Sequence, residues 1–255
     1  MKLRLQSWHW LIVYGLLIYL AFLVINLPAS VFWSMAPKDV KRTVSISNMQ
    51  GSAWSARADN IVIKGFELGK ADWTVSPFAL MLGQLGGKLN VRHALGQMET
   101  GYNLSSDQAI ELSNVNGEFS AAILDTAIPP FLLAGSIHSQ LESVQIQGRS
   151  LLTATGELQW RDASITGIAD VSLGNVTFKA SPEAKGTKLQ VTNEGGVIAI
   201  SGDIRVTGNG RYRLNLLLSS RDNRNTDLKN MLAVLGRPDA QGRVRFSPSG
   251  KLPGW

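Results

Sequence analysis

Residues 187–218 read TKLQVTNEGGVIAISGDIRVTGNGRYRLNLLL, and this stretch decides the fold class. Apolar side chains recur at every second position, for example at Leu189 and Val191. Successive residues of a β-strand point to opposite faces of a sheet, so this alternation predicts strands with one apolar and one polar face. Turn-forming residues separate the runs at 193–196, 201–203 and 208–210, where glycine permits positive φ. The stretch therefore predicts an antiparallel meander.

The same alternation recurs through most of the chain after residue 43. With 25 glycines among 255 residues and only 17% charged residues, the composition favours short strands joined by tight turns. We therefore expect a mainly β protein, built as a repetitive antiparallel sheet with a few short helices. The alternating positions are Val44 and Ile46; Ile61 and Ile63; Leu89 and Val91; Ile110 and Leu112; Leu141, Val144 and Ile146; Val171 and Leu173; Val176 and Phe178; Ile198 and Ile200; Ile204 and Val206; Tyr212, Leu214, Leu216 and Leu218.

One amphipathic helix is predicted over residues 226–238. Its apolar residues follow the i, i+3, i+4, i+7 rule of a helix that packs one face on a sheet. Thr226 or Asp227 is expected to cap its start, and Gly236 is expected at the position after its last turn. The apolar face comprises Leu228, Met231, Leu232 and Leu235, and Pro238 follows the helix.

Two segments contain a proline followed by phenylalanine, leucines and glycine: GKADWTVSPFALMLG at 69–83 and PPFLLAG at 129–135. In the first, Ser76 can cap a helical turn, Pro77 suits its first position, and Gly83 ends it. Each segment follows an Asn-containing motif, residues 47–51 and 113–117 respectively. We expect both to be short helical connections at the rim of a repeated β layer. The alternative is chance similarity between two loops.

The N-terminal region carries a long apolar run. Residues 5–37 contain no formally charged residue, and residues 10–27, WLIVYGLLIYLAFLVINL, are apolar except for Asn26. Eighteen residues are close to the minimum for a helix that crosses a hydrocarbon core of ~30 Å. Aromatic residues stand at both ends of the run, where amphipathic rings prefer the headgroup region. We therefore predict a transmembrane anchor at 10–27 that includes Trp10, Tyr14, Gly15 and Leu27.

A cleavable signal peptide is the alternative, because residues 34–36 (SMA) supply small side chains for a cut site. The run is longer than a usual signal-peptide core, and Phe32 and Trp33 crowd the site, so an uncleaved signal anchor is preferred. Lys2 and Arg4 place the N-terminus in the cytoplasm. The expected order is a cytoplasmic tail at 1–9, the anchor at 10–27, a periplasmic linker at 28–42, and a periplasmic β-rich domain at 43–255.

Charge is unevenly distributed, and it argues against nucleic-acid binding. Residues 205–255 hold ten lysines and arginines against three acids, whereas residues 43–204 hold ten against fifteen. A nucleic-acid binder needs a basic stripe interleaved with aromatic residues, which the basic tail lacks. The tail is expected either to be a solvated basic face or to dock an anionic lipid or acidic partner.

No catalytic, cofactor or metal site emerges. The chain has no cysteine, and His9, His93 and His138 are far apart in sequence. Residues 83–88, GQLGGK, fail as a phosphate-binding loop because Leu82 replaces the first glycine and Leu89 follows the lysine. We therefore expect no enzymatic activity.

Several motifs together resemble the type II secretion system protein N family, over essentially the whole chain. They are Val13-Tyr14-Gly15, Leu27-Pro28-Ala29, Gly51-Ser52-Ala53-Trp54, Trp73-Thr74-Val75-Ser76-Pro77 and residues 232–243, LAVLGRPDAQGR. The resemblance implies structural importance for Pro28, Gly51, Trp54, Trp73, Ser76, Pro77, Gly236, Pro238, Asp239, Gly242 and Arg243.

The resemblance implies a single-pass protein of a Gram-negative inner membrane, without catalytic residues, that assists export of folded proteins across the outer membrane. Its implied partners are subunits of the inner-membrane platform, with the outer-membrane secretin as a further candidate, and membrane lipids. The family is also similar to the AsmA-like group, whose repeats build a long curved sheet with an apolar trough. Two functions therefore remain open: a subunit that contacts other proteins through sheet edges, and a lipid-handling protein whose trough shields acyl chains.

Overall fold

A single antiparallel sheet of 15 strands dominates the structure, a computed structural model that describes residues 5–34, 41–42, 44–63, 66–77, 79, 83–105, 109–125, 129–147, 150–167, 170–222 and 224–251. The strands follow one another in sequence order from β1 to β14, with β2 beside β3 and β15 beside β13. Their bounds are β1 Val44–Ser47, β2 Gln50–Gly51, β3 Ser55–Ile63, β4 Phe66–Val75, β5 Leu85–His93, β6 Gly96–Leu104, β7 Ala109–Ser120, β8 Leu132–Gln147, β9 Ser150–Thr166, β10 Val171–Glu183, β11 Gly186–Glu194, β12 Ile198–Thr207, β13 Arg211–Ser220, β14 Val244–Phe246 and β15 Ser249–Lys251.

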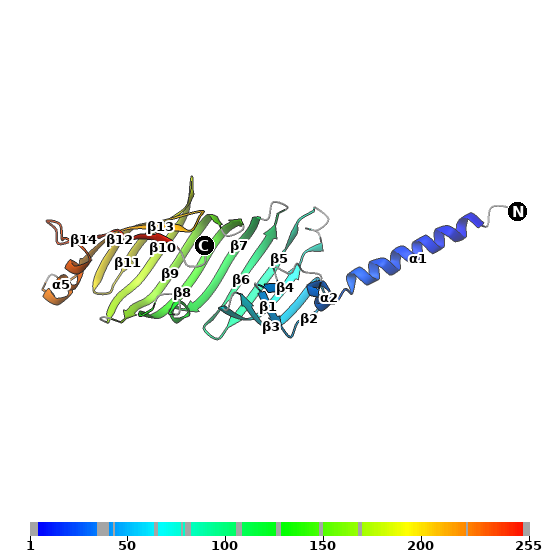
Figure 1. The fold of residues 1–255 in the computed structure, drawn as a ribbon, viewed down its shortest axis with the longest axis horizontal. Helices are drawn as coiled ribbons and strands as arrows, with labels where there is room; N and C mark the ends of the chain where they lie inside the picture. Colours follow the sequence, from blue (N-terminus) through cyan, green and yellow to red (C-terminus); the bar gives the residue numbers. More distant parts are fainter. Residues whose placement is uncertain are drawn as a thin grey trace.

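Helices lie at the two ends of this sheet (Figure 1). Helix α1 (Leu5–Ile25) extends away from the first strands, and α2 (Ala29–Ser34) lies where the chain turns back onto them. At the other end, α5 (Thr226–Leu235) lies beside β13 and β14. A short 3-10 helix, η1 (Ala121–Leu124), follows β7. The prediction of a mainly β antiparallel sheet with few helices is therefore confirmed.

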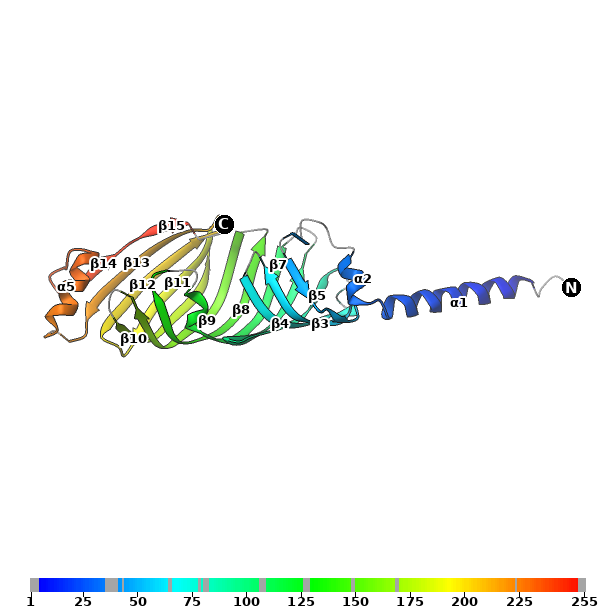
Figure 2. The same cartoon turned by 60° about the horizontal axis from the view of Figure 1, so that its bottom comes forward.

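The sheet is curved along its length (Figure 2), and one hydrophobic cluster spans several of its strands. Trp160 of β9 and Ile198 of β12 belong to one hydrophobic cluster although β10 and β11 separate their strands in the sheet. Leu228 and Leu232 of α5 complete this cluster, so the helix covers the apolar face at the C-terminal end. The core is thus made by one bent sheet and a helix that closes one end of it.

The predicted turn at 201–203 is wrong, because Gly202 lies inside β12. It pairs with Leu216 of β13 and has φ +153°, and a Cβ at this position would come within 2.1 Å of the carbonyl oxygen of Asn215. The glycine permits close approach of a neighbouring strand instead of a reversal. The two runs on either side of Gly202 consequently form one strand.

The predicted helix at 226–238 is present as α5, but its start was assigned to the wrong residues. Asn225 is the cap, since its side chain accepts a hydrogen bond from the backbone N–H of Leu228 at 3.0 Å. Gly236 has φ 168°, which is extended and not left-handed. Glycine fits there because a Cβ would come within 3.0 Å of the carbonyl oxygen of Arg245 in β14.

The two proline-phenylalanine segments differ in structure. In the first, Ser76 Oγ accepts from Ala79 N at 3.3 Å, and Gln84 N donates to the Ala79 carbonyl at 2.9 Å around Gly83, at φ +74°. This helical turn was predicted, although residues 78 and 80–82 lie outside the described residues. The second is not helical: residues 129 and 130 form a turn and the chain enters β8 at Leu132, so the prediction of two equivalent rim helices is wrong.

The preceding Asn motifs do share a conformation. Asn48 and Asn114 have φ of 57° and 51°, and both are therefore left-handed. Asn48 stands between β1 and β2, whereas Asn114 forms a bulge inside β7. The similarity of the motifs is thus a local backbone feature in two different positions of the sheet.

Helix α1 carries exposed apolar side chains along its length, including Trp10 (70% exposed) and Tyr14 (66% exposed). Over the part of the chain that the structure describes, no helix combines the length and the apolar character of a membrane-crossing segment.

Candidate functional site: two faces of the curved sheet

One face of the sheet is polar from β3 to β13. Residues that pair directly across neighbouring strands form an unbroken row on this face, which we call the polar row. Its members are Arg57, Asp72, Asn90, Glu99, Asn116, Gln140, Glu157, Lys179, Gln190, Asp203 and Asn215. None of them is apolar, as the period of two predicts.

The residues one position along each strand form the opposite face. Their row is apolar or small throughout: Ala71, Val91, Met98, Gly117, Ser139, Leu158, Phe178, Val191, Gly202, Leu216 and Phe246. At β7 and β8 this row contains only Gly117 and Ser139, whereas Val115 and Leu141, which pair with each other, keep the same face apolar beside them. The two faces are therefore chemically distinct along nearly the whole molecule.

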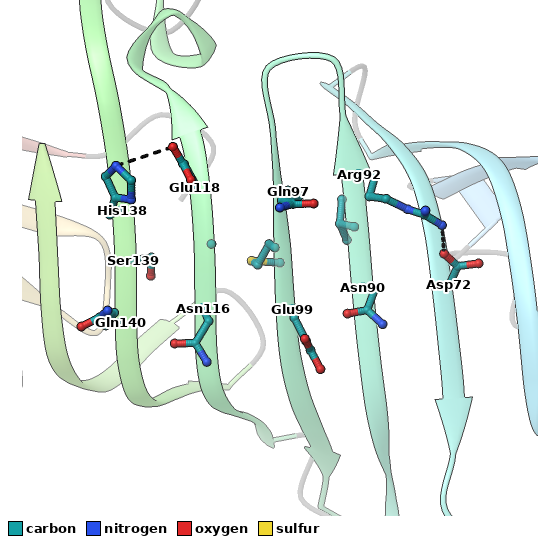
Figure 3. Close-up of a pocket in the computed structure, with 13 residues that line it drawn as sticks. Asp72, Asn90, Arg92, Gln97, Glu99, Asn116, Glu118, His138, Ser139 and Gln140 are labelled. Atoms are coloured by element: carbon teal, nitrogen blue, oxygen red, sulfur yellow. Dashed lines mark hydrogen bonds and ion pairs between the residues drawn. The ribbon is translucent and has the colours of Figure 1, made fainter. Parts of the chain in front are cut away.

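A shallow hollow of about 700 Å³ lies on the polar face between β4 and β8 (Figure 3). Asp72 at one side accepts hydrogen bonds from both Arg57 and Arg92. The Arg57 hydrogen bond, and then that of Arg92, lowers the pKa of Asp72 below its ordinary value of 3.8, although partial burial opposes the shift. The hollow thus begins at a carboxylate held ionised between two guanidinium groups.

His138, at the other side of the hollow, contacts both a serine and an acid. Its Nε2 lies 3.1 Å from Ser136 Oγ and 3.7 Å from Glu118 Oε1. A serine, histidine and acid relay needs the acid on one ring nitrogen and the serine on the other, whereas here both contact Nε2. Ser136 and His138 both lie inside β8, and Glu118 lies on the neighbouring β7. The arrangement does not form a nucleophilic triad.

The apolar face contains a pocket of about 400 Å³ at the end nearest α1. Trp33 of α2 faces it from one side, and Trp73 and Leu89 of β4 and β5 line its floor. Tyr102 also lines it; its hydroxyl donates to the Thr74 carbonyl at 3.1 Å, and burial raises the pKa of this hydroxyl. The remaining lining residues are Ala29, Ile46, Met49, Ala53, Ile61, Leu104, Ile110 and Leu112. Such a pocket suits a hydrocarbon chain.

Three contacts fix this pocket beside the end of α1. Trp54 Nε1 donates to the Val24 carbonyl at 2.8 Å, and Ala53 N donates to the Leu27 carbonyl at 2.7 Å. Pro28 forms an isolated β-bridge with Ser52. Gly51, at φ +98°, permits the approach, because a Cβ there would come within 2.4 Å of the Ser55 carbonyl oxygen.

The sequence motifs therefore assemble into two separate groups. Leu27, Pro28, Gly51 and Trp54 meet at the root of α1, and Trp73 lines the adjacent pocket. Trp10, Tyr14 and Gly15 lie on α1 away from this group, and a Cβ at Gly15 would contact nothing within 4 Å. Ser76 caps the helical turn that Pro77, which is exposed, begins.

The second group lies at the opposite end, where residues 237–243 connect α5 to β14. Asp239 Oδ1 accepts from the backbone N–H groups of Gln241 and Arg243, each at 2.9 Å, and Oδ2 accepts from Arg243 Nε at 2.8 Å. These bonds from Arg243 and Gln241 lower the pKa of Asp239. Gly242 adopts φ +73°, and Pro238 forms a β-bridge with Val244. The motif builds a self-contained turn that leads the chain into β14.

The pocket was not predicted from the sequence, although most of its residues were singled out as alternating apolar positions or motif members. Trp33 was interpreted as an aromatic residue that crowds a cleavage site, and Tyr102 and Met49 were not singled out. Alternation along a strand predicts which face of the sheet a residue occupies. It does not predict which helix packs against that face, so the position of α2 could not be inferred. Among the residues described, no group of three or more His, Asp or Glu side chains could hold a metal ion.

The fold and its two faces define a class: an elongated protein made of one curved antiparallel sheet, apolar on its inner side, with an apolar helix at its N-terminal end. The family model for type II secretion system protein N matches residues 42–247, and the chain belongs to this family. It is also similar to type II secretion system protein N of Vibrio cholerae serotype O1, with 23% identity over 249 residues, 94% of this chain and 98% of that protein. No solved structure matches it. The resemblance inferred from the motifs is thereby confirmed.

Proposed function

We propose that this chain is a non-enzymatic subunit of a type II secretion system, anchored in the inner membrane and contacting other subunits in the periplasm. Its family membership supports the assignment to this machine. The platform subunits of the inner membrane are the proposed partners, with the outer-membrane secretin as a further candidate.

The proposed anchor is residues 10–27. The absence of charge over residues 5–37 supports it, as do the exposed apolar side chains of α1. In this proposal residues 1–9 lie in the cytoplasm, residues 28–42 link the anchor to the sheet, and residues 43–255 lie in the periplasm. The basic residues Lys2 and Arg4 support this orientation.

One observation carries the proposed mode of action: α1 lies at one end of the long sheet, and β14, the last strand of the sheet order, lies at the other (Figures 1 and 2). A helix held in a membrane would leave the far edge free to meet a partner. The terminal strands are short, three residues in β14 and in β15, which limits uncontrolled edge pairing. A partner strand adding to this edge would gain main-chain hydrogen bonds.

Replacing residues 1–36 by a cleavable signal peptide tests the anchor. The released domain should be exported to the periplasm but should fail to support secretion in a strain that lacks the native protein. Restoring the anchor by fusing an unrelated single-pass helix to residue 37 is the control, and it should recover secretion. Full secretion by the released domain would contradict the proposal.

A second candidate function is lipid handling, and the apolar pocket favours it specifically. The pocket is lined by apolar and aromatic side chains, and its one phenol is already hydrogen-bonded. It also adjoins the root of α1, where a chain leaving the bilayer would first reach the sheet. A hydrocarbon chain could enter it while the Tyr102 hydroxyl keeps its hydrogen bond to the backbone.

Photocrosslinking in the native cell separates the two functions. A photoreactive amino acid at Leu89 samples the pocket, at its neighbour Asn90 the polar face, and at Ser249 the outermost strand. Protein adducts to secretion subunits at Ser249 support the interaction subunit. Phospholipid adducts at Leu89 but not at Asn90 would instead establish lipid handling as the main role.

A further inference from the structure

Several cations on the polar face between β3 and β10 are paired with acids. Arg57 pairs across the strands with Asp72, and Glu157 with Lys179 at 3.9 Å. Arg92, which faces Lys70, is also paired with Asp72. Opposite charges in directly facing positions stabilise a sheet, and like charges destabilise it. The like-charge pair of Lys70 and Arg92 is thus offset by an acid on the sheet.

Like-charge pairs follow one another on the last strands. Lys188 of β11 faces Arg205 of β12, and Arg205 in turn faces Arg213 of β13. Arg211, on the same side of β13 as Arg213, faces Lys251 of β15. Two successive like-charge pairs and a third beside them form a cluster of cations, which we call the basic row.

Few acids offset this charge. Arg205 alone is paired, with Glu183 and Asp203, each at 3.3 Å. In the described part of the chain, Lys188, Arg211, Arg213 and Lys251 make no ion pair. A hollow of about 1160 Å³ opens beside these residues, and Lys185 adds a further cation to its lining. The site thus combines unpaired positive charge with space for a ligand.

We propose that the basic row binds an acidic, extended segment of a partner protein. The inference rests on the proposed function, and it specifies where and by what chemistry the contact is made. Carboxylates placed in the hollow would relieve the repulsion between Arg205 and Arg213 and would pair with several guanidinium groups at once. β15 lies at the border of the hollow and is an outermost strand, so an extended segment can also add main-chain hydrogen bonds there.

Position favours a protein ligand over a lipid headgroup. The basic row lies on β11, β12, β13 and β15, among the last strands of the sheet order, whereas α1 joins the sheet at its first strands (Figure 1). Anionic lipid attracts cations only within about a Debye length of ~10 Å from the membrane surface. Strands β4 to β10 separate this site from the strands that adjoin α1, so the site is suited to an acidic protein.

Titration of the full-length protein in neutral detergent with fluorescein-labelled octaglutamate tests this site. We expect saturable binding that weakens as salt is raised, because the contact is between exposed charges. Arg213→Glu should weaken binding about tenfold or more, equivalent to ~1.4 kcal/mol. Arg237→Glu introduces the same charge change at an exposed residue outside the hollow and should leave binding within about twofold.

Folding provides an independent readout. Arg213→Glu replaces a like-charge pair with an opposite pair against Arg205, so its Tm should not fall below that of the parent protein. Loss of peptide binding together with a preserved Tm then assigns the effect to the site. If Arg213→Glu unfolds the protein, Lys251→Glu on the outermost strand carries the same test.

Three results would overturn the inference: no octaglutamate binding at low salt, equal weakening by Arg213→Glu and Arg237→Glu, or Arg213-dependent binding to phosphatidylglycerol vesicles in place of the peptide. All three results are measured as binding of the purified protein and do not require a secretion assay. Conversely, normal secretion by a strain that lacks the whole chain would contradict the proposed function and leave the titration unaffected, so the two failures are distinguishable.

Discussion

The indole Nε1 of Trp54 donates a hydrogen bond to the carbonyl oxygen of Val24 at 2.8 Å, and so joins the turn before β3 to the last turn of α1. The Val24 carbonyl also accepts a hydrogen bond from Leu27 N at 3.3 Å, so the tryptophan adds a second donor at the end of the helix. Together with the Ala53–Leu27 bond, this contact sets the direction in which α1 leaves the sheet. It also positions the apolar pocket beside the helix.

Trp54→Phe should loosen this junction, because it keeps the ring but removes the N–H donor. The expected loss is about 1 kcal/mol, seen as faster hydrogen exchange in the backbone of α2 and the end of α1. Trp160→Phe is the matched control, since Trp160 Nε1 makes the same type of bond to the Ala134 carbonyl at 2.9 Å within the sheet. The Trp160 variant should change exchange in β8 and β9 only; an effect on α2 would contradict the local role of Trp54.

Leu232→Ala should destabilise the C-terminal end of the sheet by about 2–5 kcal/mol, because it creates a cavity in the cluster beneath α5. Leu232 is 2% exposed, whereas Val234 on the same helix is 85% exposed. Val234→Ala should therefore change stability by less than about 0.5 kcal/mol. Denaturant unfolding of the two variants compares them directly, and equal losses would show that α5 does not pack through Leu232.

Gly202→Ala should cost about 1–3 kcal/mol, because the added methyl group collides with the backbone of β13. Its neighbour Ser201, exposed on the opposite face of β12, should accept alanine with little change. Chemical denaturation measures both. A tolerated Gly202→Ala would mean that β12 and β13 do not approach as closely as the pairing of Gly202 with Leu216 requires.

Asp72 should make stability depend on acid pH. Its pKa is lowered in the folded protein by Arg57 and Arg92, so its stabilising effect is complete above the ordinary pKa of 3.8 and is lost as pH falls through the lower folded pKa. The stability difference between the parent protein and Asp72→Asn should therefore be largest near ~pH 7 and should shrink below ~pH 4. Thermal unfolding across this range measures it.

The control for Asp72 removes its partners. In a background carrying Arg57→Gln and Arg92→Gln, Asp72→Asn should no longer show this pH-dependent difference, since both hydrogen-bond donors are absent. A difference that persists with the same pH profile would assign the effect to another interaction of Asp72.

Local patterns in the sequence predicted local structure well. The alternation at Leu214 and Leu216 produced β13, and the helical spacing of Leu228 and Leu232 produced α5. The turn predicted at Gly202 was wrong because glycine is typical both of turns and of positions where a neighbouring strand approaches closely. Only the position of that neighbouring strand decides between the two. The second proline-phenylalanine segment was also misinterpreted, because Leu132 and Leu133 belong to strand β8 and not to a helical turn.

The family, the polarity of each face and the β class followed from the sequence alone, because side-chain alternation and short motifs are properties of consecutive residues. The pocket and the basic row needed the tertiary structure. Trp33 and Leu112, which line one pocket, are 79 positions apart, and Lys188, Arg205 and Arg213 face one another only through strand register. Register and curvature arise from contacts between strands, and residue order along the chain does not specify those contacts directly.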